Sequence, residues 1–193
     1  MAKILAFSGS TRVGSFNERL VKVAAEGARA AGAKVTVVNL RDYPMPIFDQ
    51  DDEAANGKPK GAIALKKLMM KHDGFLIASP EYNSSVTAVL KNAIDWVSRP
   101  DDSDPPGGLA AFRGKVVTLM SASPGALGGL RGLVHVRAIL GNIGCIVLPD
   151  QVAIPVAHEA FNEEGAFVDI QKENAIRTLG QTLANTVEKL NGP

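Results

Sequence analysis

The stretch KILAFSGSTRVGSFN, residues 3–17, decides the fold of this chain. A short apolar run, Ile4–Phe7, ends abruptly in small and polar residues, and a helical pattern starts near Phe16. This order predicts a strand, a loop and a helix. Because a helix N-terminus has unpaired N–H groups and a partial positive charge, we expect the loop to bind an anion, phosphate above all.

The loop offers several hydroxyl groups and one arginine. Arg12 is expected to add a forked, charge-assisted contact to a phosphate. Ser15 is followed three residues later by Glu18, a spacing that predicts a capping box at the start of the helix. The alternative is an ordinary strand-to-helix loop with a good cap, since glycine and serine suit any turn.

The type of phosphate can be narrowed by what the loop lacks. Gly9–Ser15 has the glycine spacing of a P-loop but no lysine for the β- and γ-phosphates, so hydrolysis of a nucleoside triphosphate is not expected. The dinucleotide fingerprint fails as well, because Thr11 stands at its second glycine and the next strand ends in Asn39-Leu40 without an acid. What remains is a hydroxyl-rich cup for a terminal phosphate monoester, such as that of flavin mononucleotide (FMN).

Composition bounds the class of protein. A chain of 193 residues with 46% hydrophobic and 21% charged residues predicts one globular domain. The net charge of +1 gives no reason to expect a nucleic-acid or membrane partner, and it disfavours a small electron carrier that steers to partners by charge. Cys145 is the only cysteine and lies in an apolar run, which predicts a buried structural thiol. A strand within three residues of the N-terminus leaves no room for a signal peptide, so we expect a cytoplasmic protein.

Apolar runs alternate with helical patterns along the whole chain, which predicts a single α/β domain with a parallel sheet covered on both faces. The polar stretch 49–61 is interpreted as a solvated surface loop, and the Pro- and Gly-rich stretch Ser98–Ala111 as a mobile rim or an inter-subunit arm. Strands are expected at 3–7, 34–39, 74–78, 115–120 and 145–148, with a further short apolar run at 152–156, and helices at 16–31, 62–71, 87–97, 129–142 and 169–190.

Three strand ends carry unusual chemistry, namely the first, the third and the fourth. In the strand order 2-1-3-4-5 these strands are neighbours, and ligands of open parallel sheets bind beyond the carboxyl ends of the strands. After the third strand, Pro80 and Tyr82 are expected to flank a flat ring, although Tyr82 also suits a boundary aromatic. For Glu81 a carboxylate paired with a nearby base is at least as good an interpretation as ring contact.

The loop after the fourth strand, Ser121–Gly125, consists of small residues that let the backbone approach a ligand closely. Its N–H groups, with the start of the next helix, are expected to stabilise negative charge on a reduced ring. Gly128 and Gly129 suit that role and, equally, helix packing or loop flexibility. Lys91 and Asp95 predict a surface ion pair. The scattered histidines and the absence of a G-x-S-x-G motif give hydrolase chemistry little support.

Taken together, the motifs GSTRVGSFN, PEYNSS, LKNAIDW and SASPGALGG resemble those of the NAD(P)H-dependent FMN reductases, and within them the bacterial quinone and chromate reductases of flavodoxin-like fold. The resemblance covers about residues 3–156. It implies FMN-binding roles along all three loops: for the phosphate and ribityl chain Ser10, Arg12, Ser15, Phe16 and Asn17; along the isoalloxazine Pro80, Glu81, Tyr82, Asn83 and Ser84; and to complete the ring site Ser121, Ser123 and Gly125.

The resemblance also implies an activity. NAD(P)H would give a hydride to FMN and a second small acceptor would take the electrons in a ping-pong exchange, with no side chain nominated as a catalytic acid or base and no metal. Quinones are the expected acceptors, while chromate, ferric chelates and azo dyes stay open, as does the choice between NADH and NADPH. A homodimer or homotetramer is implied, with the flavin near a subunit interface. The rival interpretations are an FMN-binding electron carrier and a flavin-dependent sensor.

Overall fold

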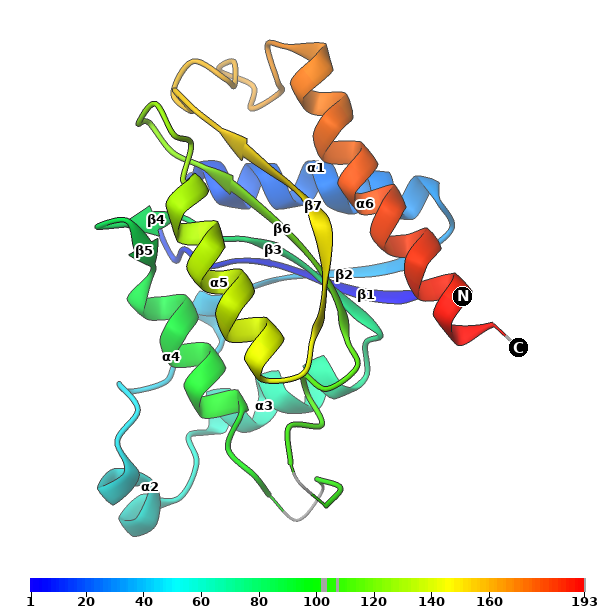
Figure 1. The fold of residues 1–193 in the computed structure, drawn as a ribbon. Helices are drawn as coiled ribbons and strands as arrows, with labels where there is room; N and C mark the ends of the chain where they lie inside the picture. The colour runs from blue at the N-terminus through cyan, green and yellow to red at the C-terminus, as the bar shows by residue number, and fades with distance from the viewer. Residues whose placement is uncertain (102–103, 107, 193) are drawn as a thin grey trace.

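The computed structural model describes residues 1–101, 104–106 and 108–192. Five parallel strands form one sheet in the order β2-β1-β3-β6-β7, which confirms the predicted order 2-1-3-4-5 of a flavodoxin-like fold (Figure 1). The strands span Lys3–Ser8 (β1), Lys34–Asn39 (β2), Gly74–Ala78 (β3), Val116–Ala122 (β6) and Ile146–Ile154 (β7).

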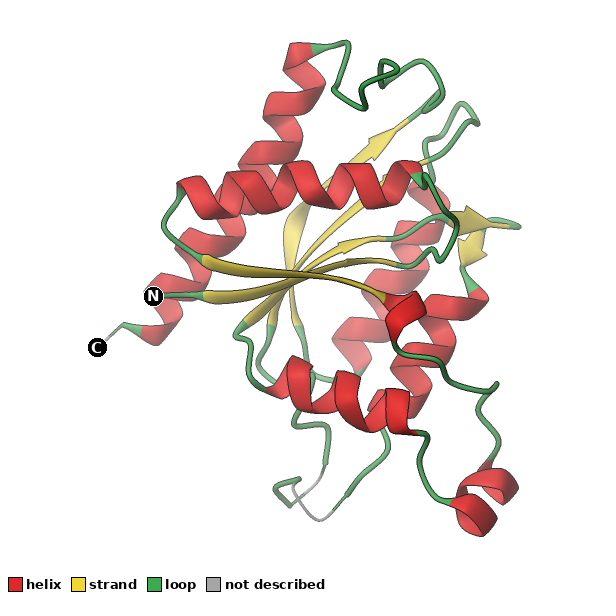
Figure 2. Cartoon of the chain, turned by 180° about the vertical axis from the view of Figure 1, so that it is seen from behind, coloured by secondary structure: helices red, strands yellow, loops and turns green. Residues whose placement is uncertain are grey.

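Helices cover both faces of the sheet and make a three-layer sandwich (Figures 1 and 2). Alternate residues of the central strands point to opposite layers: Ile4 and Ala6 belong to the core under α1 and α6, while Leu5 and Phe7 belong to the core under α3, α4 and α5. The helices span Phe16–Ala30 (α1), Lys60–Met70 (α3), Ala88–Val97 (α4), Leu130–Asn142 (α5) and Ile170–Asn191 (α6).

The prediction of a loop over residues 49–61 is wrong in part, because the helix α2 spans Gln50–Asn56. The Asp49 carboxylate accepts a hydrogen bond from the Asp51 N–H at 2.8 Å and so caps the helix, and the acidic first turn suits the helix dipole. No residue of α2 is buried, so hydrophobic periodicity gave no sign of it. A short 3-10 turn, Leu40–Asp42, connects β2 to this region.

The apolar runs 145–148 and 152–156 were expected as separate segments, but both contribute to the single strand β7. Val147 pairs with Val117, and Gln151 pairs with Leu119, so the register shifts between these pairs. This bulge accommodates Pro149, which an edge strand tolerates because it needs no second ladder of hydrogen bonds.

The PEYNSS segment forms a β-hairpin that was not predicted from the sequence. The strands β4 (Glu81–Tyr82) and β5 (Ser85–Val86) are joined by Asn83 and Ser84, whose φ angles are 50° and 65°. Positive φ at both central residues is the requirement of a type I′ turn, which matches the twist of the flanking strands. The hairpin therefore holds the residues after β3 in a defined position.

The stretch Ser98–Ala111, predicted as a mobile rim or an inter-subunit arm, includes residues 102–103 and 107, which lie outside the described residues. The remainder is tied to α3 through Lys66, whose ammonium group lies 2.5 Å from the Asp104 carboxylate in a site where both side chains are 3% exposed. These residues lie at the end of α4 opposite to the β4–β5 hairpin (Figure 1).

Candidate cofactor site

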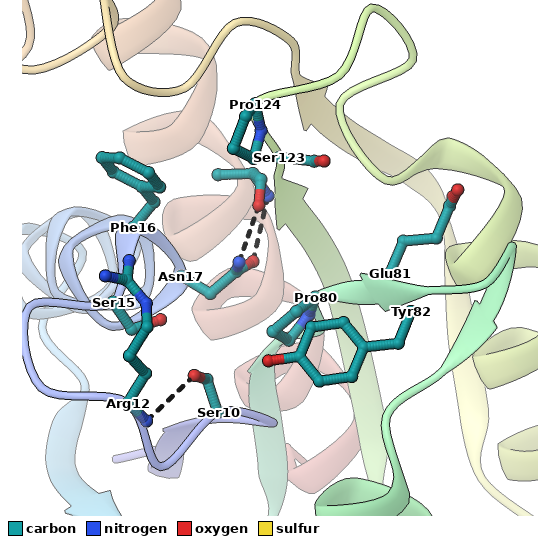
Figure 3. A pocket seen from close by; sticks show the side chains of 11 residues that line it. Ser10, Arg12, Ser15, Phe16, Asn17, Pro80, Glu81, Tyr82, Ser123 and Pro124 are labelled. Atoms are coloured by element: carbon teal, nitrogen blue, oxygen red, sulfur yellow. Dashed lines mark hydrogen bonds between the residues drawn. The ribbon is translucent and has the colours of Figure 1, made fainter.

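A pocket of about 270 Å³ lies over the carboxyl ends of β1, β3 and β6. The three loops singled out in the sequence meet there, as their neighbouring strands require. All but four of the predicted site residues line it, and two further residues, Ala122 and Pro124, join them. The lining consists of Ser10, Arg12, Ser15, Phe16, Asn17, Pro80, Glu81, Tyr82, Ala122, Ser123 and Pro124 (Figure 3).

The loop after β1 presents hydrogen-bond donors to this pocket. Ser15 is the N-cap of α1, but its side chain makes no capping hydrogen bond, and Glu18 pairs instead with Lys22 at 2.8 Å. The predicted capping box is therefore wrong, since the i,i+4 ion pair takes the Glu18 carboxylate. The N–H groups of Phe16 and Asn17 open the helix and have no acceptor within it, so both the Ser15 hydroxyl and this first turn suit an anion.

Of the described residues that line the pocket, Arg12 alone is cationic. Its guanidinium group donates to the Gly14 carbonyl at 3.1 Å and lies 5.4 Å from the centre of the Phe16 ring. Its backbone N–H donates to the Ser10 hydroxyl at 3.2 Å, which tightens the turn (Figure 3). The loop thus holds a positive charge beside two serine hydroxyls, which is the chemistry that a phosphate monoester needs.

Asn17 joins two of the loops. Its amide donates to the Ala122 carbonyl at 2.7 Å and accepts the Ala122 N–H at 2.9 Å, while the side chain is buried (Figure 3). These two bonds fasten the start of α1 to the end of β6. Asn17 is therefore a positioning residue that fixes the distance between the phosphate loop and the loop after β6.

The loop after β3 forms the opposite wall. Tyr82 is 57% exposed and extends across the pocket mouth beside the rigid Pro80 ring, whereas the Glu81 carboxylate points away toward α5 (Figure 3). That carboxylate accepts the Gly132 N–H at 2.9 Å and Arg131 Nε at 2.9 Å. Burial acts to raise the Glu81 pKa, but the Gly132 and Arg131 hydrogen bonds and the Arg131 charge together lower it below its ordinary value. The paired-carboxylate interpretation of Glu81 is confirmed.

Four predicted site residues lie outside the lining. Asn83 and Ser84 form the hairpin turn, and Gly125 lies further along its loop. Ser121 is fully buried beneath Gly129: a Cβ atom at Gly129, where φ is +93°, would lie 1.9 Å from the Ser121 hydroxyl oxygen. A side chain at Gly129 would therefore clash with Ser121, which supports the packing interpretation, while a role of this helix start toward a ligand stays a prediction.

Ala122 and Pro124 were missed, although a signal existed. Side chains alternate along β6, which ends at Ala122, so the neighbours Ser121 and Ala122 face opposite sides of the sheet, and only one of the two can face the pocket. One further prediction away from the pocket is confirmed, because Lys91 and Asp95 pair at 2.6 Å.

The donor set fits FMN. At one end of the pocket a guanidinium group, two hydroxyls and free helix N–H groups suit a doubly charged phosphate, and at the other the flat or rigid faces of Pro80, Tyr82 and Pro124 suit an aromatic ring system. The geometry therefore describes a site for a flat aromatic ligand that carries a terminal phosphate.

Comparison with known proteins agrees with this geometry. Residues 2–159 match the family described as NADPH-dependent FMN reductase. The chain is 32% identical over 191 residues to an NAD(P)H-dependent FMN reductase of Pseudomonas aeruginosa, covering 98% of this chain and 97% of that protein. It is 31% identical over 169 residues to a quinone reductase of Escherichia coli K12, covering 86% and 85% of the two chains. The structure of the flavoenzyme NAD(P)H:(acceptor) oxidoreductase FerB from Paracoccus denitrificans superposes with a TM-score of 0.80 over 98% of each chain, at 25% identity.

The chain belongs to the NADPH-dependent FMN reductase family. The resemblance inferred from the three loop motifs is therefore confirmed, and with it the expectation of an FMN-dependent oxidoreductase with NAD(P)H as electron donor. Among the described residues no helix is both long and apolar enough to cross a bilayer.

Proposed function

We propose that this protein passes electrons from NAD(P)H, through FMN bound in the pocket of Figure 3, to quinones. One observation carries the proposal: a loop with a guanidinium group, two hydroxyls and a helix N-terminus meets two walls with flat or rigid side chains over three adjacent strands of the sheet. The quinone reductase of Escherichia coli, similar over most of its length, supports a quinone as the acceptor. Chromate, ferric chelates and azo dyes remain alternative acceptors that the same site would admit.

Each wall of the pocket has a separate task. Arg12, Ser10 and Ser15 hold the phosphate, and Asn17 keeps their loop at a fixed distance from β6. Pro80, Tyr82 and Ser123 lie along the ring system. When bound, FMN supplies the hydride-accepting chemistry, so no side chain of the pocket needs to act as an acid or base.

The rival functions are an electron carrier that is reduced only by a protein partner and a sensor in which FMN is structural. The net charge of +1 offers no strong field for steering a protein partner. Parallel lines in double-reciprocal plots of rate against NADPH, at several fixed benzoquinone concentrations, are expected for the ping-pong reductase. Turnover that benzoquinone does not increase would instead favour the sensor.

We further propose a cytoplasmic homo-oligomer, either a dimer or a tetramer. Near the pocket, Leu127, Leu130 and Val134 at and before the start of α5 are 49%, 43% and 57% exposed, and a neighbouring subunit would cover this apolar strip. Light scattering coupled to size exclusion tests the proposal: a mass of twice or four times the chain's 20.3 kDa is expected, and a mass of one chain would contradict it.

A further inference from the structure

A second pocket of about 170 Å³ lies next to the first, on the other side of the phosphate loop. It lies between the segment that follows β2, the loop after β1 and the outer face of α4. Thr11 belongs to its wall, while Ser10 and Arg12 on either side belong to the first pocket. Its lining consists of Thr11, Leu40, Arg41, Tyr43, Pro44, Met45, Val89 and Asn92.

The strand order fixes how far apart the two pockets are. The sheet runs β2-β1-β3, so the end of β2 and the end of β3 lie on the two sides of β1. Two strand spacings separate them, which is about 10 Å. A ligand with one aromatic group over the β3 loop and a second over the end of β2 would therefore pass directly over the phosphate loop, a span that an extended dinucleotide covers.

The second pocket has the chemistry of a site for a base and a phosphate. Leu40, Pro44, Met45 and Val89 give it apolar walls, and its volume suits a two-ring base better than the three rings of a flavin. The Tyr43 hydroxyl is protonated at neutral pH and offers a hydrogen-bond donor, and burial with the neighbouring Asp42 carboxylate raises its pKa further above its ordinary value.

Arg41 supplies the charge. Its guanidinium group donates to the Thr11 carbonyl, and its side chain is exposed. The remaining N–H groups of the fork are available to a phosphate. The same contact couples the second pocket to the loop that lines the first, so the two pockets share one structural element.

We propose that the second pocket binds the adenosine-phosphate half of NAD(P)H, with its base against Val89 and Met45 and its phosphate on Arg41. The proposal rests on the proposed function, because it presumes that the nicotinamide half reaches FMN in the first pocket. It assigns to Arg41, Tyr43 and Val89 a role in recognising the electron donor.

The test separates the two halves of the donor. Reduced nicotinamide mononucleotide carries the hydride but lacks adenosine, whereas ADP-ribose carries the adenosine half and no hydride. Val89→Phe fills the pocket, and Val168→Phe makes the same change at a position that is 69% exposed and outside both pockets. Arg41→Met removes the charge while it keeps most of the side-chain volume.

Calorimetry of the oxidised, FMN-loaded protein is expected to show ADP-ribose binding that Val89→Phe and Arg41→Met each weaken by about tenfold or more, equivalent to about 1.4 kcal/mol. Val168→Phe is expected to bind it as the wild type does. The KM for NADPH should rise in the two pocket variants, while kcat/KM for reduced nicotinamide mononucleotide stays unchanged. Retained FMN absorbance in each variant shows that it has folded.

Three results would overturn the inference. In the first, neither Val89→Phe nor Arg41→Met changes the binding of ADP-ribose. In the second, the variants lower kcat/KM equally for NADPH and for reduced nicotinamide mononucleotide. In the third, Val89→Phe changes only the binding of flavin adenine dinucleotide to the apoprotein. Failure of the proposed function would look different, because then reduced nicotinamide mononucleotide would also leave the flavin oxidised.

Discussion

At the scale of single residues, the pocket separates groups that touch a ligand from groups that position others. Arg12 and the Ser15 hydroxyl have hydrogen-bonding capacity left for a phosphate. The polar side-chain atoms of Asn17 are hydrogen-bonded to Ala122, and those of Glu81 are hydrogen-bonded to α5. Substitutions at the first two residues should therefore change ligand affinity directly, and substitutions at the other two should change it through the loops.

Arg12→Ala is expected to weaken FMN binding by about 10- to 100-fold, since a hydrogen bond to a charged group contributes about 1.5–3 kcal/mol. Fluorescence titration of the apoprotein with FMN measures the dissociation constant, and riboflavin, which lacks the phosphate, is the control ligand. Riboflavin affinity should be nearly the same in both proteins. If Arg12→Ala holds FMN as tightly as the wild type does, the phosphate assignment is wrong.

Cys145 is expected to resist thiol reagents in the native state. The thiol is 9% exposed and hydrogen-bonded to the Phe112 carbonyl at 3.4 Å, and burial raises its pKa to about 12 despite the nearby Lys115. Titration with Ellman's reagent at pH 8 should detect almost no thiol in the folded protein and one per chain in guanidinium chloride. Rapid native labelling would show that this thiol is accessible.

At the scale of elements, α5 holds the β4–β5 hairpin through two contacts. The Glu81 carboxylate binds Arg131 and the Gly132 N–H, and the Ser85 hydroxyl lies 2.8 Å from His135 Nδ1. The hairpin carries Tyr82 over the pocket, so α5 determines the position of that ring wall.

This hairpin contact gives a pH dependence whose sign follows from the Glu81 pKa. In the folded protein that pKa lies below 4.5, its ordinary value. The contact therefore makes its full contribution to the stability of the folded protein above pH 4.5. That contribution is lost as the pH falls through the pKa of Glu81 in the folded protein. Urea unfolding of the wild type and of Glu81→Gln should differ at pH 7 and converge below pH 4.5. A difference that grows on acidification would contradict this contact.

Lys66 fastens the stretch after α4 to α3. Because its ammonium group and the Asp104 carboxylate are both buried, Lys66→Ala leaves an unpaired charge and should cost about 3–5 kcal/mol of unfolding free energy. Lys67→Ala, one residue on and exposed, is the matched control and should change little. In urea unfolding, the double variant Lys66→Ala/Asp104→Ala should recover part of the unfolding free energy that Lys66→Ala loses. If it recovers none, the loss comes from side-chain packing and not from the unpaired charge.

The elements that sequence reasoning found and missed differ in how they are stabilised. The five long strands and their helices bury apolar faces, so periodicity identified them. The α2 helix has no buried residue and is capped by Asp49, and the hairpin depends on two residues at positive φ, so neither leaves a hydrophobic pattern. The sequence signal for the hairpin was the pair Asn83-Ser84, because asparagine and serine favour a two-residue turn between short strands.

At the scale of the whole molecule, strand order is what makes a site out of three loops. β1, β3 and β6 are adjacent and parallel, so their carboxyl ends meet along one edge. This principle identified the pocket from the sequence. It could not decide which side chains at a strand end face the ligand, and so Ser121 was assigned to a site that Ala122 and Pro124 line instead.

The same edge continues past the first pocket to the end of β2, where Thr11 and Arg41 connect the two pockets. A ligand that fills both would contact four of the five loops or segments at this edge. The second pocket could not be predicted from the sequence, because its walls come from a connecting segment without periodicity and from half-buried residues of α4.

The most direct test of the account is the visible spectrum of the purified protein under anaerobic conditions, before and after NADPH is added. We expect a flavin spectrum that bleaches within the mixing time, as an NAD(P)H-dependent FMN enzyme requires. A protein that stays colourless after incubation with FMN, or a flavin spectrum that persists in NADPH, would contradict the central claim.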